Sequence, residues 1–336
     1  MSAPRLDALS VQVAIENFPL REPFIITGST MWDTDVVVVT LGKDGQLGRG
    51  EASGVSYHAG DDAPGMLRQI EAVRGKLEAG LDREALQALL PAGGARNAVD
   101  CALWDLEAKL DGRPAWQIAG LETPRALLTT FTVGANVPAK MAADARAYVQ
   151  ARAIKMKLTG EAEDADRVRA VRAARPEVWL SIDANQGFDR ASLARLMPVL
   201  VEARVQLVEQ PFPIGQEALM DGLDCPIPCA ADESAQGLAD LRGLVGRFQV
   251  VNIKLDKCGG LSEGLAMARE ARRLGLEVMV GNMIGSSLAM APAFLVGQLC
   301  SVVDLDGPVF LQRDRPHPVS YVDGKVSCPD ALWGGA

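Results

Sequence analysis

The sequence predicts an α/β chain: a TIM-like (β/α)7–8 barrel with an α+β capping domain formed mainly by the N-terminal segment. From residue 129 onward, short apolar runs alternate with amphipathic segments, a pattern typical of a parallel sheet covered by helices. Charged residues follow most of these runs at a spacing of about 22 to 28 residues, the length of one strand plus one helix. The length of 336 residues allows a barrel and a second, smaller domain.

The capping domain is expected over residues 1–120. Its strands should be antiparallel, because a Gly-Lys-Asp-Gly hairpin turn at residues 42–45 joins the last two of them. We expect these strands at residues 6–16, 34–42 and 47–54. Helices are indicated where apolar residues recur at three- and four-residue steps, at residues 65–79, 82–90 and 95–110.

The barrel is expected over residues 121–308, and residues 309–336 are expected to pack back on the cap. Eight apolar runs mark the barrel strands, and most of them end in a charged residue. Residues that end parallel strands surround one mouth of such a barrel, where barrel enzymes carry their chemistry. The strands are predicted at TTFTV (129–133), IKMKL (154–158), WLSIDA (179–184), QLVEQ (206–210), CAADE (229–233), VVNIKL (250–255), LEVMVG (276–281) and SVVDLDG (301–307).

The composition excludes several kinds of partner. The net charge is −9, without a basic cluster, which disfavours nucleic acid and anionic membrane surfaces. The longest weakly polar stretch, residues 288–300, is too short to span a bilayer. The N-terminal residues show no secretory signal, and the six cysteines are scattered without a CxxC pair. We therefore expect a cytoplasmic protein with a small-molecule substrate, and we leave a homo-oligomer open.

Three carboxylates end successive predicted strands. Asp183, Glu209 and Asp232 follow the third, fourth and fifth barrel strands. Carboxylates that converge without a histidine or thiol suit a hard, oxygen-binding divalent cation. We expect Mg²⁺, with Mn²⁺ as the alternative. The competing interpretation is that each carboxylate caps the helix that follows it.

Lysines flank these acids. Lys155 and Lys157 are two residues apart in one strand and so face the same side, whereas Lys254 ends the sixth strand, roughly opposite in an eight-stranded ring. Neighbouring ammonium groups are expected to lower each other's pKa, as a lysine base needs near neutral pH. A cation between two lysines favours removal of a proton next to a substrate carboxylate, through an enediolate that the metal stabilises. The alternative for each lysine is a solvated charge on the rim.

The order Lys-x-Lys, Asp, Glu, Asp, Lys, within IKMKL, DANQ, VEQP, ADES and NIKLDKCGG, resembles the muconate-lactonising subgroup of the enolase superfamily. PAGGARNAVDCALWDL and DLDGP are similar to its dipeptide epimerases, which include L-Ala-D/L-Glu epimerase. The resemblance implies a Mg²⁺-dependent isomerase that inverts the α-carbon of the C-terminal residue of a dipeptide by two-base 1,1-proton transfer. It makes Lys157 and Lys254 the acid/base catalysts and puts Lys155 beside the metal-bound carboxylate.

The same resemblance implies that Asp304 and Asp306 bind the free α-ammonium group of the dipeptide. Thr132, at the end of the first barrel strand, is a further candidate for substrate contact. Two carboxylates on one face of the eighth strand form an anionic pocket, for which a cycloisomerase acting on anionic rings has no use. The alternative is that Asp306-Gly-Pro is a turn and that Asp304 is a cap.

One stretch departs from the resemblance. In Ala-Glu epimerases an arginine in the cap loop after the first strand pairs with the glutamate side chain, whereas residues 23–35 here, PFIITGSTMWDTD, contain no basic residue. Asp33 and Asp35 add negative charge, so that Arg21 or a more distant base would have to compensate. We expect a neutral, hydrophobic or cationic side chain on the epimerised residue at least as readily as glutamate. Trp32 is expected in the core of the cap, with pocket lining as the alternative.

Two other functions stay open. A muconate cycloisomerase or an o-succinylbenzoate-synthase-like enzyme would use the same metal and lysines on a substrate without an amine. A non-catalytic barrel that binds a partner would need no lysine on either face of the site.

Overall fold

The N-terminal region is built on an antiparallel sheet. The computed structural model describes residues 6–26, 29–55 and 57–336. Asp44 and Gly45 have φ angles of 51° and 80°, as a two-residue type I′ hairpin requires. The predicted antiparallel strands and their turn are therefore confirmed. The sheet has the order β1 (Ser10–Ile26), β2 (Ser29–Lys43) and β3 (Gln46–Ala52).

The hairpin of β1 and β2 runs further than the sequence predicts. The two strands pair as far as Ile26 and Ser29, so most of the stretch 23–35 is strand rather than loop. Their register shifts between Pro19 and Phe24. An irregularity of this kind interrupts the two-residue alternation by which a strand is found in a sequence.

Two expectations concern the tip of this hairpin. Thr27 and Gly28, in the stretch without a basic residue, lie outside the described residues. Trp32 was expected in the cap core, and that expectation is wrong, because its side chain is 69% exposed.

Helices cover the sheet, and α3 lies directly against β3. A β-carbon added at Gly48 would lie 2.3 Å from the carbonyl oxygen of Ala102, and one at Gly50 would lie 2.1 Å from that of Ala98. These two glycines therefore serve the close approach of a helix to the sheet. The helices of this region are α1 (Ala63–Glu78), α2 (Arg83–Leu89), α3 (Gly94–Asp111) and α4 (Ala115–Ile118).

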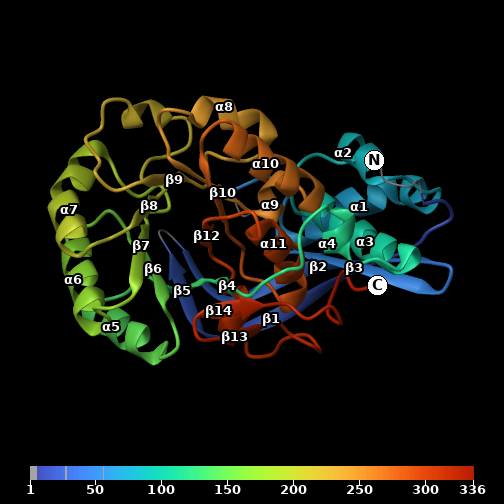
Figure 1. The fold of residues 1–336 in the computed structure, drawn as a ribbon, viewed down its shortest axis with the longest axis horizontal. Coiled ribbons are helices and arrows are strands. Elements are labelled where there is room, and N and C mark those ends of the chain that lie inside the picture. The colour runs from blue at the N-terminus through green and yellow to red at the C-terminus, as the bar shows by residue number, and fades with distance from the viewer. Residues whose placement is uncertain (1–5, 27–28, 56) are drawn as a thin grey trace.

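The second region is a barrel of eight parallel strands, hydrogen bonded in chain order from β5 to β12 (Figure 1). Side chains link its two edge strands: the Thr130 hydroxyl donates to Asp304 at 2.5 Å, and the Leu305 N–H donates to Oγ1 of Thr129 at 2.9 Å. All eight predicted strands, and with them the fold class, are confirmed. They are β5 (Thr130–Val133), β6 (Ala153–Lys157), β7 (Trp179–Asp183), β8 (Leu207–Glu209), β9 (Cys229–Ala231), β10 (Val250–Ile253), β11 (Glu277–Val280) and β12 (Val302–Val303).

Helices of varied length separate the strands. The α-helices are α5 (Pro138–Ala147), α6 (Asp164–Ala174), α7 (Arg190–Glu202), α8 (Leu241–Leu244), α9 (Leu255–Cys258), α10 (Leu261–Arg273) and α11 (Ser287–Gly297). Three short 3-10 helices are η1 (Glu217–Met220), η2 (Leu238–Asp240) and η3 (Gly307–Phe310). Among the helices of the described residues, none is both long enough and apolar enough to cross a membrane.

The inside of the barrel is filled at the end opposite the charged residues. Leu207, Ala230, Val250 and Met279, from four successive strands, form a separate buried cluster there. Side chains of this kind close the interior, so the barrel is a packed core and chemistry is confined to its other end.

The C-terminal residues contact both regions. The indole N–H of Trp333 lies 2.9 Å from the Arg49 carbonyl oxygen and 3.1 Å from that of Cys101, both in the cap. Figure 1 shows the C-terminus beside β3 and α3. Before it, β13 (Ser320–Val322) and β14 (Lys325–Ser327) form a small antiparallel sheet with β4 (Leu127–Leu128).

Candidate active site

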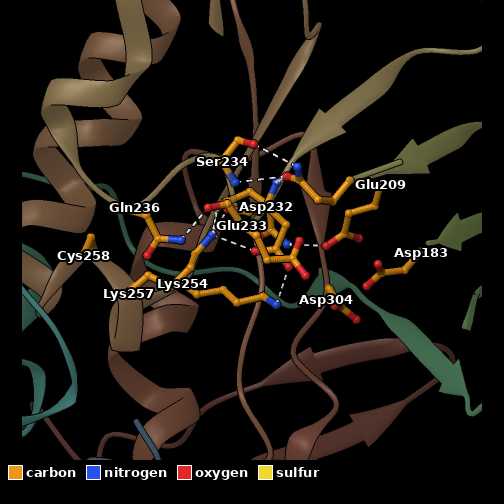
Figure 2. A network of polar contacts seen from close by, with 12 residues as sticks. Asp183, Glu209, Asp232, Glu233, Ser234, Gln236, Lys254, Lys257, Cys258 and Asp304 are labelled. Carbon is orange, nitrogen blue, oxygen red and sulfur yellow. Dashed lines mark hydrogen bonds and ion pairs between the residues drawn. The ribbon is translucent and has the colours of Figure 1, made fainter. Parts of the chain in front are cut away.

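Three buried carboxylates converge at the carboxyl ends of neighbouring strands. Asp183 ends β7, Glu209 ends β8, and Asp232 directly follows β9. Each side chain is at most 1% exposed, and one ligand oxygen from each lies within 4.8 Å of the others. The sequence placed these acids at successive strand ends, and the structure brings all three together (Figure 2).

Lys155 and Lys157 reach this cluster from β6, the neighbouring strand. The ammonium nitrogen of Lys155 lies 3.1 Å from Asp183, 2.7 Å from Glu209 and 2.9 Å from Asp304. Lys157 lies two residues further along the strand, toward the mouth, and its nitrogen is 2.6 Å from Oδ2 of Asp183. Alternation along the strand puts both lysines on the inner face, as predicted.

Asp232 is held from the other side by two lysines. Nζ of Lys254 lies 2.6 Å from Oδ2 of Asp232, and Nζ of Lys257 lies 2.6 Å from Oδ1. Lys257 also donates to the Asn252 carbonyl oxygen at 3.1 Å. Figure 2 shows both ammonium groups directed at the same acid. The sequence interpretation did not include Lys257 in the site, but its ammonium group holds a member of the carboxylate cluster.

The lysines shift the pKa values of the acids in different directions. Burial raises the pKa of Glu209 to about 8, and the charge of Asp183 adds to the effect. Burial would also raise the pKa of Asp183, but Lys157 and Lys155 outweigh it and hold that pKa at about 2. The pKa of Asp232 is also lowered, because neighbouring lysines outweigh its burial. Glu209 is thus the hardest of the three acids to ionise.

The pKa values of Lys254 and Lys155 are shifted in the direction opposite to the expected one. Burial acts to lower the pKa of Lys254, and Lys155 adds to that effect, but the nearby carboxylates outweigh both and hold the pKa above its ordinary value. The pKa of Lys155 is raised for the same reason, with Asp304 as its strongest partner. Repulsion between ammonium groups was expected to dominate. That repulsion is present, since Lys155 acts to lower the pKa of Lys254, but the attraction of the nearby carboxylates is larger.

The two acids of β12 lie next to the end of β5. Asp304 accepts hydrogen bonds from Thr130 and, at 2.9 Å, from Lys155. Oδ2 of Asp306 accepts the backbone N–H of Thr132 at 2.6 Å. Burial, together with the charge of Asp304, raises the pKa of Asp306 to about 7. The Asp-x-Asp pair therefore faces the same mouth as the lysines.

A cavity of about 50 Å³ joins these groups. Its polar part is formed by the lysines and the Asp-x-Asp pair, and its apolar part by Phe24 of the cap, Ile284 of the loop after β11, and Phe310 of η3. The rings of Phe24 and Phe310 lie 4.7 Å apart between centroids. The apolar residues were missed by the sequence interpretation, because they lie in irregular segments that only tertiary folding brings to the barrel mouth.

The two cap acids do not point toward this cavity. The hydroxyl of Thr34 donates to the Ile284 carbonyl oxygen at 3.1 Å, so Thr34 faces the barrel. Asp33 and Asp35, its neighbours in β2, are exposed and lie on the opposite face of the strand. The expectation that these acids add negative charge beside the substrate is therefore wrong.

The carboxylate cluster has the chemistry of a divalent-cation site. Its ligands are hard oxygen atoms, as Mg²⁺ and Mn²⁺ prefer. A second layer orients one of them, since Nδ2 of Asn252 donates to Oε1 of Glu209 at 2.8 Å. Three carboxylates this close repel one another, and a cation would replace the lysine contacts that now offset their charge. The residues present therefore fit a magnesium site.

Two family models together cover most of the chain. Residues 8–120 match the N-terminal domain of the mandelate racemase/muconate lactonizing enzymes, and residues 140–333 match the enolase C-terminal domain-like model. The L-Ala-D/L-Glu epimerase of Escherichia coli is 38% identical over 94% of this chain and 99% of its own length. An N-acetyl-D-glutamate racemase of Pseudoalteromonas is 41% identical over 74% of this chain and 78% of its own length.

Solved structures agree with these matches. An enolase family member from Agrobacterium tumefaciens with homology to dipeptide epimerases, with bound sodium and L-Ala-L-Glu, superposes with a TM-score of 0.94 at 40% identity, covering 97% of this chain and 100% of its own. A dipeptide epimerase from Methylococcus capsulatus, in complex with Mg and L-Arg-D-Lys, gives 0.89 at 31% identity over 96% and 98% of the chains. The chain therefore belongs to the enolase superfamily, in its mandelate racemase/muconate lactonizing branch.

Proposed function

We propose that this protein is a Mg²⁺-dependent dipeptide epimerase, an isomerase that inverts the α-carbon of the C-terminal residue of a dipeptide. The observation that carries the proposal is the pair Lys157 and Lys254, which approach one carboxylate cluster from β6 and β10, the second and sixth strands of the barrel. Inversion of a stereocentre needs an acid/base group on each face of the reacting carbon. The names of several relatives, such as L-Ala-D/L-Glu epimerase and L-Lys-D/L-Arg epimerase, support the same activity.

Asp183, Glu209 and Asp232 would hold the cation. When bound, Mg²⁺ (or Mn²⁺) would neutralise the negative charge that develops on the substrate carboxylate after the α-proton leaves. Lys155, which contacts both Asp183 and Glu209, is suited to donate a hydrogen bond to that carboxylate. Its burial excludes water and strengthens the interaction.

The proton transfers are assigned to the two outer lysines. In one direction Lys157 removes the α-proton, and Lys254, on the other face, delivers a proton to the same carbon. In the reverse direction the roles exchange. The lysine that acts as the base must be neutral, because an ammonium group cannot accept a proton, whereas the lysine on the other face must be protonated in order to deliver one. Ligation of Asp183 and Asp232 by the cation would weaken these ion pairs and so favour the neutral form of the lysine that acts as the base.

Asp304 and Asp306 are proposed to bind the free α-ammonium group of the dipeptide, with Thr132 beside them. The proposal is supported by their position at the cavity, since both carboxylates line it together with the three lysines. An ammonium group there would replace or supplement the present partners of the two acids. A cycloisomerase substrate lacks such a group, so the Asp-x-Asp pair favours an epimerase over that alternative.

The remaining assignments follow the sequence argument. We propose a cap at residues 1–120, a catalytic barrel at 121–308, and a C-terminal segment at 309–336 that packs on the cap. A cytoplasmic location is supported by six cysteines that are all free thiols.

The second candidate function, a cycloisomerase or o-succinylbenzoate-synthase-like enzyme, shares the metal and the lysines. A non-catalytic barrel is disfavoured, because it would have no use for buried lysines on both sides of the cluster.

A dipeptide library incubated in D₂O with Mg²⁺ tests the proposal. An epimerase incorporates deuterium at one α-carbon while the substrate mass otherwise stays unchanged, and mass spectrometry with chiral separation reads both events. Deuterium uptake confined to the C-terminal residue of some dipeptides is the expected result. Turnover of succinylbenzoate precursors or muconates, with no exchange in any dipeptide, would assign the protein to the second function.

A further inference from the structure

The connection from β8 to β9 carries two cysteines whose sulfur atoms are in contact. Cys225 and Cys229 are separated by Pro-Ile-Pro, and their Sγ atoms lie 3.5 Å apart. Two prolines fix backbone angles on both sides of Ile227, and each also restricts the residue before it. The loop that brings the sulfurs together is therefore pre-organised. Sequence spacing alone had given no reason to assign the pair a redox role.

One member of the pair is fixed and the other is adjustable. Cys229 is buried at the start of β9, where its N–H donates to Oε1 of Gln249 at 2.9 Å. Its neighbour Pro228 accepts the N–H of Val208 in β8 at 3.0 Å. Cys225 is half-buried and lies outside any helix or strand. Cys225 is therefore the member of the pair nearer to solvent, and Cys229 is the buried one.

The contact also makes the accessible sulfur the stronger acid. The hydrogen bond between the two sulfur atoms lowers the pKa of Cys225 to about 7. The same contact, with burial, raises the pKa of Cys229. Because the thiolate is the reactive form of cysteine, Cys225 is the nucleophile at neutral pH and Cys229 is the protonated partner.

The other four cysteines differ from this pair. Cys101 and Cys258 are buried, whereas Cys300 and Cys328 are half-buried. Burial raises the pKa of all four, to about 12 for Cys258 and Cys328. They therefore provide an internal reference for thiols of low reactivity in the same protein.

We propose that Cys225 and Cys229 form a redox site at which a hydroperoxide is reduced and an intramolecular disulfide is made. The Cys225 thiolate attacks the peroxide, an S–O bond forms, the O–O bond breaks, and hydroxide (or an alkoxide) leaves. The sulfur of Cys229 then attacks Cys225, the Sγ–Sγ bond forms, and the sulfenic oxygen leaves as water with the Cys229 proton. Two electrons pass from the thiols to the peroxide, and a thiol reductant restores the pair.

The site lies away from the proposed catalytic machinery. A disulfide needs its sulfurs about 2.05 Å apart, so the bond requires a further approach of the two atoms. Cys225 is the residue that must move, because the backbone of Cys229 is held in the sheet by β8 and β10. Asp232 is three residues further along, about 10 Å at the rise of a strand, at the opposite end of β9. We therefore expect oxidation to leave epimerase activity within about twofold of the reduced enzyme.

Mass spectrometry of the full-length protein tests the site. Both cysteines fall within one tryptic peptide, residues 205–242. After hydrogen peroxide treatment and alkylation, this peptide should be unlabelled and lighter by two hydrogen atoms, and it should take two labels after reduction. Alkylation of the reduced protein at pH 7 should modify Cys225 at least about tenfold faster than Cys300 or Cys328.

Variants separate the pair from general oxidation. Cys225→Ser should prevent the loss of hydrogen and leave Cys229 alkylatable after peroxide, whereas Cys300→Ser, the matched control, should behave as wild type. The proposal is overturned if wild type keeps all six thiols under conditions that oxidise glutathione. It is equally overturned if Cys225 stops at sulfinic acid, or if disulfides form between chains instead. None of these readouts depends on epimerase activity, so they do not depend on the proposed function.

Discussion

The ammonium nitrogen of Lys157 lies 2.6 Å from Oδ2 of Asp183, so that a proposed base touches a proposed metal ligand on the neighbouring strand. Lys254 makes a contact of the same length with Asp232 on the other side of the cluster. A carboxylate oxygen that binds a cation is no longer available to hold a lysine so tightly. Metal binding and the release of both lysines are therefore expected to be coupled.

Loss of either outer lysine should stop epimerisation. Lys157→Ala and Lys254→Ala should each lower kcat by a factor of about 10² to 10⁴, the usual contribution of a positioned acid/base group. Each variant should still exchange the α-proton of one stereoisomer with D₂O, because one base remains on one face. Proton NMR of each isomer measures this exchange. Lys325→Ala, an exposed lysine on β14, is the control. Wild-type epimerisation by Lys254→Ala would refute the two-base assignment.

Removal of the cation should abolish turnover. Chelation with EDTA is expected to inactivate the enzyme, and added Mg²⁺ or Mn²⁺ should restore it, because three hard ligands and no soft one surround the site. Asp183→Asn, Glu209→Gln and Asp232→Asn should each weaken Mg²⁺ binding, as measured by calorimetry. Full activity of the metal-stripped protein would contradict the proposal.

Metal affinity should increase with pH. In the protein without a cation the pKa of Glu209 is raised to about 8 by burial, whereas those of Asp183 and Asp232 are lowered. Glu209 must lose its proton to bind Mg²⁺, so one proton is released per metal ion below pH 8 and affinity falls as pH falls. We expect roughly a tenfold loss per pH unit there, seen by calorimetry in buffers of different ionisation enthalpy. Glu209→Gln should bind Mg²⁺ more weakly, and its affinity should no longer depend on pH in this range. An unchanged pH dependence would show that another group releases the proton.

The sequence predicted the site residues that recur at the spacing of one strand plus one helix, and it missed the site residues outside that spacing. Asp183 and Glu209 end buried runs at a regular spacing, and parallel strands bring such ends together whatever the helices between them do. The role of Lys257 was missed because α9 is a single turn that brings its ammonium group back to Asp232, and nothing in the strand spacing signals that turn. Phe310 was not predicted as a lining residue of the cavity, because its contact with the cap depends on tertiary packing.

A buried ion pair between the cap and the C-terminal segment should matter for stability. Nη2 of Arg315 lies 2.6 Å from Oε2 of Glu51, which is 1% exposed, and Ser286 of α11's N-cap donates its N–H to Glu51 at 2.7 Å. Arg315→Met would leave Glu51 buried with its charge partner removed. Such changes cost about 3 to 5 kcal/mol, and urea unfolding monitored by circular dichroism measures the loss.

A surface pair provides the control for this prediction. Arg273 and Glu270 approach to 2.6 Å, but the arginine side chain is 61% exposed. Arg273→Met should therefore change the free energy of unfolding by less than about 1 kcal/mol. Equal losses for the two variants would show that the contact of Arg315 with Glu51 contributes no more than an ordinary surface pair.

The last prediction concerns the side chain of the epimerised residue. The cavity next to the lysines has apolar walls from Phe24, Ile284 and Phe310, and among the described lining residues the cations are the three lysines committed to the acids. Arg21 donates through Nε to the Leu311 carbonyl oxygen at 2.8 Å and lines a neighbouring cavity instead. A glutamate carboxylate in the apolar part would therefore lose water without gaining a counter-charge.

Burial of an unpaired charge costs several kcal/mol, and about 1.4 kcal/mol corresponds to a tenfold loss in kcat/KM. We therefore expect Ala-Leu and Ala-Phe, whose second side chains carry no charge, to exceed L-Ala-L-Glu by at least about tenfold in kcat/KM. Asp304→Asn should lower kcat/KM for all of these dipeptides by a similar factor, since the ammonium group is common to them. Asp33→Asn and Asp35→Asn should leave the ranking unchanged, because these side chains are exposed on the far face of β2.

A gain-of-function variant makes the test two-sided. Met31 pairs with Phe24 across the hairpin and, like Phe24, packs against the core of the barrel, so Met31→Arg introduces a cation next to an aromatic wall of the cavity. It should raise kcat/KM for L-Ala-L-Glu relative to Ala-Leu, whereas Met31→Leu should not. The Escherichia coli relative is named for Ala-Glu, and a clear preference of the unmodified protein for that dipeptide would show that a base outside residues 23–35 pairs with the glutamate. In that case Met31→Arg should add little, because the counter-charge would already be present.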